Sequence, residues 1–320
     1  MSAPLVSIVI PAHNRRSYLP ETLESVFAQR YRPVEVIVID DGSTDGTREW
    51  LESLGDRIRL LTQDAQGVAV ARNVASRLAT GEYLAFQDDD DLMPPDRIPV
   101  LMDALQRFPE AVLATGDYAL IDAEGTLTGD RWMPARTDED EAPRLLPDGQ
   151  EAILWPRVPA VPHTTLFRTV TGERAGWFDP AFRYACSDAD FLARLGRLGP
   201  IVYVPRIVSL YRRGHRAIWH DELKANCSRL QLWLKHLDMV SESSPLHCRL
   251  LERIEGAVGM IAEMRGAGLR FDDPTYLRFY ESAIARLPVS GRLRARVVKR
   301  ARGKLRRLAG RIKDSEPEIR

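Results

Sequence analysis

Short runs of apolar, β-branched residues alternate with helical patterns along the first part of the chain. Residues 6–10, 34–39 and 83–86 are such runs, and between them apolar residues recur three and four positions apart. Alternation of this kind is typical of a largely parallel sheet with helices on both faces. The predicted fold class is therefore α/β, with a Rossmann-like, mostly parallel central sheet.

Each of these runs ends in polar residues. His13 and Asn14 follow the first run, Asp40 and Asp41 follow the second, and the aspartates 88–91 follow the third. Because binding sites on such sheets lie at the carboxyl ends of the strands, we expect these side chains at one edge of the sheet.

The run Asp88-Asp89-Asp90-Asp91 carries the strongest chemical signal. Four neighbouring carboxylates repel one another, and hard divalent cations such as Mg²⁺ or Mn²⁺ bind both carboxylate and diphosphate oxygens. A solvated acidic turn is the alternative. The position directly after a buried strand, near two other polar strand ends, favours a divalent cation site.

The pattern changes in the second half of the chain. A stretch rich in proline and charge predicts a mobile loop over residues 130–150, and from about residue 219 only helical patterns remain. We expect one domain over residues 1–218 and a helical C-terminal region over 219–320. Within these parts, strands are expected over 111–115, 118–121, 164–167 and 201–204, and helices over 101–108, 188–198, 230–237, 250–261 and 276–287.

Composition narrows the class of protein further. The three cysteines are scattered and fit neither a disulfide framework nor a metal-ligand pair. The first residues have no basic region, and no apolar stretch reaches the ~18 residues that a membrane span needs. A cytoplasmic location is therefore expected.

The C-terminal end of the chain is strongly basic. Residues 289–320 hold 12 Lys/Arg against three Asp/Glu, within a chain of 45 basic and 45 acidic residues. In the segment 291–313 apolar residues recur every three or four positions, a basic amphipathic pattern suited to an anionic membrane surface on the inner face. Packing of the apolar stripe on the domain is the alternative. Aromatic residues are absent from this stretch, which argues against a nucleic-acid partner.

Four segments in this order resemble the inverting family-two glycosyltransferases of the GT-A fold: Val6–Asn14, Val36–Thr47, Gly67–Ala75 and Gly81–Asp91. The resemblance covers roughly residues 5–215. It implies that a sugar moves from a nucleoside diphosphate sugar, most commonly of UDP, to a hydroxyl of a glycan or lipid-linked acceptor, with Mg²⁺ or Mn²⁺ as cofactor. Cell-envelope polysaccharide or glycolipid synthesis is the implied setting, with a nucleotide-sugar half over about 1–115 and an acceptor half over about 116–218.

The resemblance also implies site residues. The donor nucleotide is expected to contact Pro11, His13, Asn14, Asp41, Arg72, Asp88 and Asp89. Asp90 and His215 are implied as metal ligands, with a structural role as the alternative for the histidine. Arg72 could pair with phosphate oxygens or neutralise an aspartate across the site, and Arg212 could clamp the diphosphate or face water.

The family's catalytic base lies near the start of a later helix. Gly176–Asp179 matches the family segment that precedes it, and Asp188 fills the position of the base, although Ser187 stands where the family usually has Glu. An ordinary helix N-cap is the alternative for Asp188. The implied acceptor region holds three further residues: His163, Trp177 and Asp190.

Two other functions remain open at this stage. A nucleotidyltransferase would also use an aspartate cluster with Mg²⁺, but it usually has a glycine-rich phosphate loop, and residues 11–19 contain no glycine. A non-catalytic protein that binds a sugar nucleotide or a partner is the second alternative. Retention of both Asp90 and Asp188 argues against it.

Overall fold

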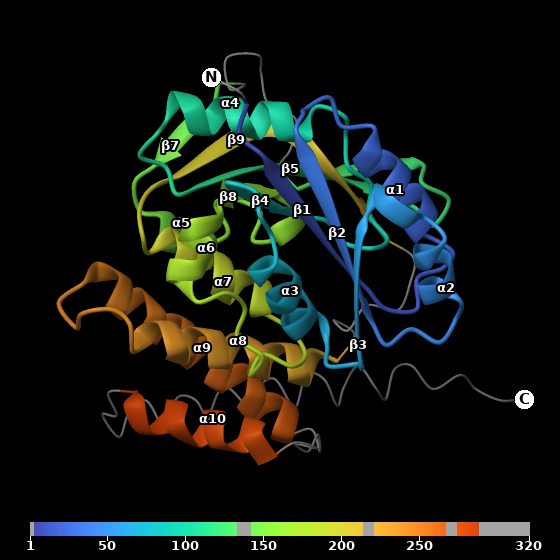
Figure 1. Ribbon diagram of the computed structural model, residues 1–320. Helices are drawn as coiled ribbons and strands as arrows, with labels where there is room; N and C mark the ends of the chain where they lie inside the picture. Colours follow the sequence, from blue (N-terminus) through green and yellow to red (C-terminus); the bar gives the residue numbers. More distant parts are fainter. Residues whose placement is uncertain (1–2, 133–141, 214–220, 267–273, 288–320) are drawn as a thin grey trace, which may run out of the picture. The chain divides into compact units, whose positions relative to one another are not determined.

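The computed structural model describes residues 3–132, 142–213, 221–266 and 274–287. The chain divides into two compact units, one of residues 1–183 and 187–215 and the other of residues 184–186 and 216–320. His215 and the basic segment 291–313 lie outside the described residues. Figure 1 shows the fold, coloured along the sequence.

A nine-stranded sheet forms the centre of the first unit. Its strands are β1 (Val6–Ala12), β2 (Val34–Asp41), β3 (Arg59–Gln63), β4 (Tyr83–Phe86), β5 (Leu113–Ile121), β6 (Leu127–Arg131), β7 (Arg144–Leu146), β8 (Thr165–Arg168) and β9 (Ile201–Arg212). Their order is β3-β2-β1-β4-β8-β5-β9-β7, with β6 paired to β5. The pairs β3–β2, β2–β1, β1–β4 and β5–β9 are parallel, whereas β8 runs antiparallel to both β4 and β5.

Helices cover both sides of this sheet (Figure 1). They are α1 (Leu19–Phe27), α2 (Thr47–Glu52), α3 (Val68–Arg77), α4 (Arg97–Arg107), α5 (Gly149–Leu154), α6 (Thr169–Ala175) and α7 (Ser187–Gly196). Alternate residues of β1, including Ile8 and Ile10, pack with Leu23 of α1 and Leu101 of α4 in one apolar cluster. On the other side Phe86, at the end of β4, packs edge-on against Phe178 with ring centroids 5.2 Å apart.

The second unit is helical over its described residues. It contains α8 (Glu222–Leu237), α9 (Pro245–Gly266) and α10 (Pro274–Arg286). Asp221 caps α8 by accepting the backbone N–H of Lys224, and Leu230 and Leu250 are fully buried. None of the helices in the described part of the chain is long and apolar enough to cross a membrane.

The predicted fold class is confirmed, and three details differ. The two strands expected over 111–115 and 118–121 are one strand, β5, with register shifts near Asp117. The loop expected over 130–150 is wrong in part, because β7 and the start of α5 lie within that range. The strand expected over 201–204 continues as β9 to Arg212, which brings its end beside the aspartate run.

Candidate active site

The loops that follow β1 and β2 are held together by side chains at their tips. His13 donates from Nδ1 to the backbone oxygen of Asp41 at 2.7 Å, because a carbonyl can only accept. Asn14 accepts the N–H of Thr44 at 2.8 Å and donates its own N–H to Ser43 Oγ at 3.0 Å. His13 and Asn14 are exposed, so the first strand end is fixed but open to solvent.

Asp41, the predicted nucleotide contact at the end of β2, has a nearly buried carboxylate. One oxygen accepts from Gln63 Nε2 at 2.7 Å and from the N–H of Gln66 at 2.8 Å, and the other accepts the N–H of Gly67 at 2.8 Å. These bonds hold the turn that leads into α3. Pro11 lies buried within β1, opposite Ile39 of β2.

The aspartate run meets the first loop through its middle residues. Asp89 accepts the N–H of His13 at 3.0 Å. Arg15 Nε lies 3.5 Å from Asp89 Oδ1 and 3.3 Å from Asp90 Oδ2. Burial, followed by the neighbouring Asp90, raises the pKa of Asp89 to about 8. Arg15 thus offsets only part of the repulsion within the run.

Arg72 joins the aspartate run to the predicted catalytic base. Its guanidinium donates from Nη2 to Asp88 Oδ1 and from Nη1 to Asp188 Oδ1, each at 2.6 Å. Arg72 is only 3% exposed. Burial raises the pKa of Asp188 above its usual value, and the charge of Arg72 opposes that rise. This contact corresponds to the second of the two roles considered for Arg72, which is to neutralise an aspartate across the site.

Asp91, the last residue of the run, and His163 are almost fully buried. Asp91 Oδ1 accepts the N–H of Arg212 at 2.8 Å, whereas Oδ2 has no hydrogen-bond partner among the described residues. His163 Nδ1 lies 3.2 Å from Asp91 Oδ2 and 2.7 Å from Ser209 Oγ. Burial lowers the pKa of His163 to about 4 and raises that of Asp91, so this contact is not an ion pair at neutral pH.

A divalent cation fits this part of the site. Ligand atoms of Asp88, Asp91 and His163 lie within 4.8 Å of one another. The buried, unpaired Asp91 Oδ2 and the raised pKa of Asp89 indicate negative charge that the surrounding side chains do not balance. Asp90, the predicted ligand, lies beside this group and contacts Arg15. His163, which was expected in the acceptor region, shares this group with two aspartates.

The other two acceptor-region residues form part of the packing behind α7. Trp177 is buried and stacks on Phe191 with ring centroids 6.1 Å apart. Asp190 is fully buried and accepts from Arg194 Nε at 3.0 Å and Nη2 at 2.8 Å. Arg194 also donates to the carbonyl of Trp177, so these contacts brace the segment that carries Asp188.

Two buried arginines support the site from below. Arg97 donates to the carbonyls of Phe86 at 2.7 Å and Thr165 at 3.2 Å, and burial lowers its pKa to about 9. Arg212 donates from Nε to the carbonyl of Asp90 at 2.7 Å and is 1% exposed. Arg212 therefore neither faces water nor presents its Nε to a diphosphate.

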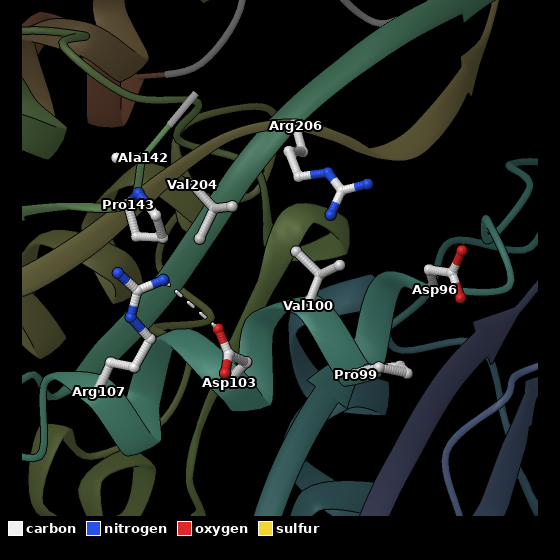
Figure 2. Close-up of a pocket in the computed structure, with 9 residues that line it drawn as sticks. All are labelled: Asp96, Pro99, Val100, Asp103, Arg107, Ala142, Pro143, Val204 and Arg206. Atoms are coloured by element: carbon white, nitrogen blue, oxygen red, sulfur yellow. Dashed lines mark ion pairs between the residues drawn. The ribbon is translucent and has the colours of Figure 1, made fainter. Parts of the chain in front are cut away.

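A pocket of about 620 Å³ lies apart from these residues, between α4 and β9. Figure 2 shows Arg107 and Asp103 as an ion pair on one side of it and Arg206 on another. None of the predicted site residues lines it. Its lining residues are Asp96, Pro99, Val100, Asp103, Arg107, Ala142, Pro143, Val204 and Arg206.

Residues 7–168, half of the chain, match the family model described as "Glycosyl transferase family 2". The chain belongs to glycosyltransferase family 2. This membership confirms the resemblance inferred from the four sequence segments.

TuaG of Bacillus subtilis (strain 168), whose name refers to teichuronic acid biosynthesis, is 39% identical over 127 residues, 38% of this chain and 50% of that protein. An uncharacterized glycosyltransferase of Rickettsia typhi is 29% identical over 218 residues, 67% of this chain and 65% of that protein. The chondroitin synthase of Escherichia coli is 35% identical over 127 residues, 39% of this chain and 18% of that protein. The chain thus spans about half to 65% of the length of three curated relatives that it matches, two of them being TuaG and the Rickettsia typhi protein.

Solved structures confirm the GT-A fold. S. aureus TarS 1–349 in complex with UDP matches with a TM-score of 0.63 and 16% identity, over 98% of this chain and 93% of that one. The mannosyltransferase PcManGT from Pyrobaculum calidifontis, in complex with GDP-Man and Mn²⁺, matches with a TM-score of 0.57 and 20% identity, over 95% and 81%. At these identities the likeness concerns the fold alone.

Proposed function

We propose that this chain is a metal-dependent, inverting glycosyltransferase that moves a sugar from a nucleoside diphosphate sugar to an acceptor hydroxyl. The contact of Arg72 with both Asp88 and Asp188 carries the proposal, because this one side chain connects the candidate base to the aspartate run. Family membership supports sugar transfer over the nucleotidyltransferase alternative.

The donor would lie along the ends of β1, β2 and β4. His13 and Asn14 are open to solvent there, and Asp88 and Asp89 follow β4. Asp90, with Asp88 and the buried pair Asp91 and His163 beside it, would hold Mg²⁺ or Mn²⁺. When bound, that cation would supply positive charge against the diphosphate leaving group.

Asp188 would act as the general base. It would accept the proton of the acceptor hydroxyl while the hydroxyl oxygen attacks the anomeric carbon, on the face opposite the departing diphosphate, which inverts the configuration. The N-terminus of α7 favours the charged carboxylate, and Arg72 does the same. A positioned base of this kind contributes typically ~10²–10⁴ in rate.

The donor nucleotide and the acceptor class are proposed from the names of similar proteins. UDP is the first nucleotide to test, since the TarS structures hold UDP or UDP-GlcNAc, with GDP second because PcManGT holds GDP-Man. The names of TuaG and of chondroitin synthase support a polysaccharide or other glycan acceptor. We further propose cytoplasmic action, with attachment to the inner membrane face through residues 291–313.

Calorimetric titration of UDP, GDP and dTDP, with and without Mn²⁺, tests the donor site. We expect one diphosphate to bind only with Mn²⁺, and we expect Asp90→Ala to lose that binding. Asp103→Ala, which changes an exposed aspartate of α4, is the matched control and should bind as the wild type does. Failure of all three diphosphates to bind in the presence of Mn²⁺ would sink the transferase proposal.

A further inference from the structure

Three aromatic side chains lie together at the end of the sheet beside the aspartate run. The ring of Tyr118 lies 5.7 Å from that of Trp132 and 5.6 Å from that of Tyr211, measured between centroids. The imidazole of His163 lies 6.0 Å from Tyr118 and 5.4 Å from Tyr211. We call Tyr118, Trp132 and Tyr211 the aromatic platform.

The strand pairing explains why these residues meet. In the parallel pair β5–β9, Leu120 lies opposite Tyr211. Residues two positions apart on a strand share a face, so Tyr118 and Tyr211 lie on the same face of the sheet. The β5–β6 pair then turns the chain back, and Trp132 donates its N–H to the carbonyl of Tyr118 at 3.0 Å. All three belong to the first compact unit.

The platform differs from the interior aromatic cluster around Phe86. Phe86 is fully buried, whereas all three platform residues are only partly buried. Among the described residues, the buried Nε1 of Trp132 has no hydrogen-bond partner. A buried tryptophan usually pairs its N–H, so this unpaired Nε1, beside two partly exposed tyrosine rings, points to a ligand.

The platform also lies next to the proposed metal site and the proposed base. His163, on which both tyrosines pack, is 3.2 Å from Asp91. Asp91 and the imidazole are within 4.8 Å of Asp88, which Arg72 connects to Asp188.

We propose that Tyr118, Trp132 and Tyr211 bind a pyranose ring of the acceptor, which makes the acceptor a carbohydrate. An aromatic face matches the C–H face of a pyranose, and the hydroxyls and the indole N–H match its hydroxyl groups. An acyclic polyol or a simple lipid alcohol presents no such ring. The inference rests on the proposed function, since it assigns the acceptor side of the same site.

Saturation-transfer NMR on the full chain tests the proposal without needing the natural acceptor. The probes are methyl β-D-glucopyranoside, methyl β-D-glucuronide and methyl N-acetyl-β-D-glucosaminide, with ribitol as the acyclic control, each with and without UDP and Mn²⁺. We expect ring-proton saturation for at least one glycoside and none for ribitol. Tyr118→Leu and Tyr211→Leu should each weaken the signal by about threefold or more, whereas Tyr118→Phe and Tyr211→Phe, which keep the ring, should retain most of it.

Calorimetry with the diphosphate on the same variants separates the possible failures. If the Leu variants keep the glycoside signal, or if the wild type gives no signal with any glycoside, the aromatic platform does not bind the acceptor. Diphosphate binding by the same protein would still support the proposed function. If the glycoside signal depends on the platform but the wild type binds no diphosphate, the platform is supported and the proposed function is contradicted. Loss of diphosphate binding in the Leu variants alone would reassign the platform to the donor and refute an acceptor role.

Discussion

Nη1 of Arg72 lies 2.6 Å from Oδ1 of Asp188, a residue 116 positions further along the chain. The other terminal nitrogen of the same guanidinium contacts Asp88 at the end of β4. A single buried cation therefore serves two carboxylates from opposite sides of the site. A change in charge at Asp88 therefore changes how strongly Arg72 stabilises the carboxylate of Asp188.

Substitution of Arg72 should therefore be costly to stability. In Arg72→Met two acidic groups lose their shared cation. Because the side chains of Asp88 and Asp188 are 27% and 34% exposed, water offsets part of that loss. The free energy of unfolding should fall by about 1–3 kcal/mol. Arg72→Lys keeps a charge but not two parallel donors, so its loss should be smaller. Urea unfolding of the two variants measures this difference. Equal stability of Met and Lys variants would show that the charge of Arg72 contributes nothing.

Asp188→Asn should silence transfer while leaving the donor site in place. We expect a rate lower by about 10²–10⁴, because the amide cannot accept the acceptor proton. Affinity for the metal–diphosphate pair should change little. Asp103→Asn, which changes an exposed aspartate of α4, is the control and should keep the wild-type rate. Full transfer activity in Asp188→Asn would remove it as the base.

Removal of divalent metal should make stability depend on pH. Asp89, with a pKa near 8, and Asp91 are harder to deprotonate in the folded chain than in the unfolded chain. A carboxylate with a raised folded pKa destabilises the fold progressively as pH rises from its unfolded pKa of about 4 toward the folded value. In chelator the melting temperature should thus be higher at about pH 6 than at about pH 8.5.

Mn²⁺ should remove most of that difference, because the cation balances the charges that repel one another. Asp103→Ala should follow the wild type in both conditions, whereas Asp90→Ala should respond less to the metal. Differential scanning fluorimetry at the two pH values gives all of these comparisons. A metal-free protein equally stable at both would contradict uncompensated charge at Asp89 and Asp91.

Glu35 of β2 should matter for stability rather than for activity. Its carboxylate accepts from Ser7 Oγ and from the N–H groups of Thr80 at 2.6 Å and Gly81 at 3.1 Å. Burial raises the pKa of Glu35, but these hydrogen bonds lower it more, so the net shift is downward. Such a group stabilises the fold above its unfolded pKa and loses that effect as pH falls through the lowered folded pKa.

Glu35→Ala should therefore lower the free energy of unfolding by about 1–3 kcal/mol at neutral pH. The difference from wild type should shrink when the pH falls below about 4. Glu24→Ala, which removes an exposed ion pair with Arg57, should change stability by less than about 1 kcal/mol and serves as the control. A constant Glu35→Ala difference from pH 7 to pH 3 would contradict a role for the charged carboxylate.

Local sequence patterns were sufficient for the strand ends that build the donor side. The runs before His13, Asp41 and Asp88 are apolar and β-branched, and such patterns indicate a buried strand wherever they occur. The same patterns do not distinguish a parallel from an antiparallel strand, so the antiparallel direction of β8 could not be read from residues 164–167.

Local sequence patterns could not predict which arginines are buried beneath the site. Arg97, Arg212 and Arg15 sit in segments where arginine is usually solvated, and only tertiary contacts show that the first two are buried. The grouping of His163 with Asp91 likewise depends on residues 72 positions apart being brought together by β8 and β4. Asp188 was predicted as the base because its position matched a family segment; its contact with Arg72 could not be predicted from the sequence.

The antiparallel strand β8 lies between β4 and β5, and Arg97 ties its Thr165 carbonyl to that of Phe86. A piece of the second half of the chain is thus a structural neighbour of the strand that ends at the aspartate run. For protein engineering this means that a crossover near residue 115 would separate β4 from β8, its neighbour in the sheet. A functional chimera would need to carry residues 165–168 together with the first hundred residues, so that the recombined segments share one parent.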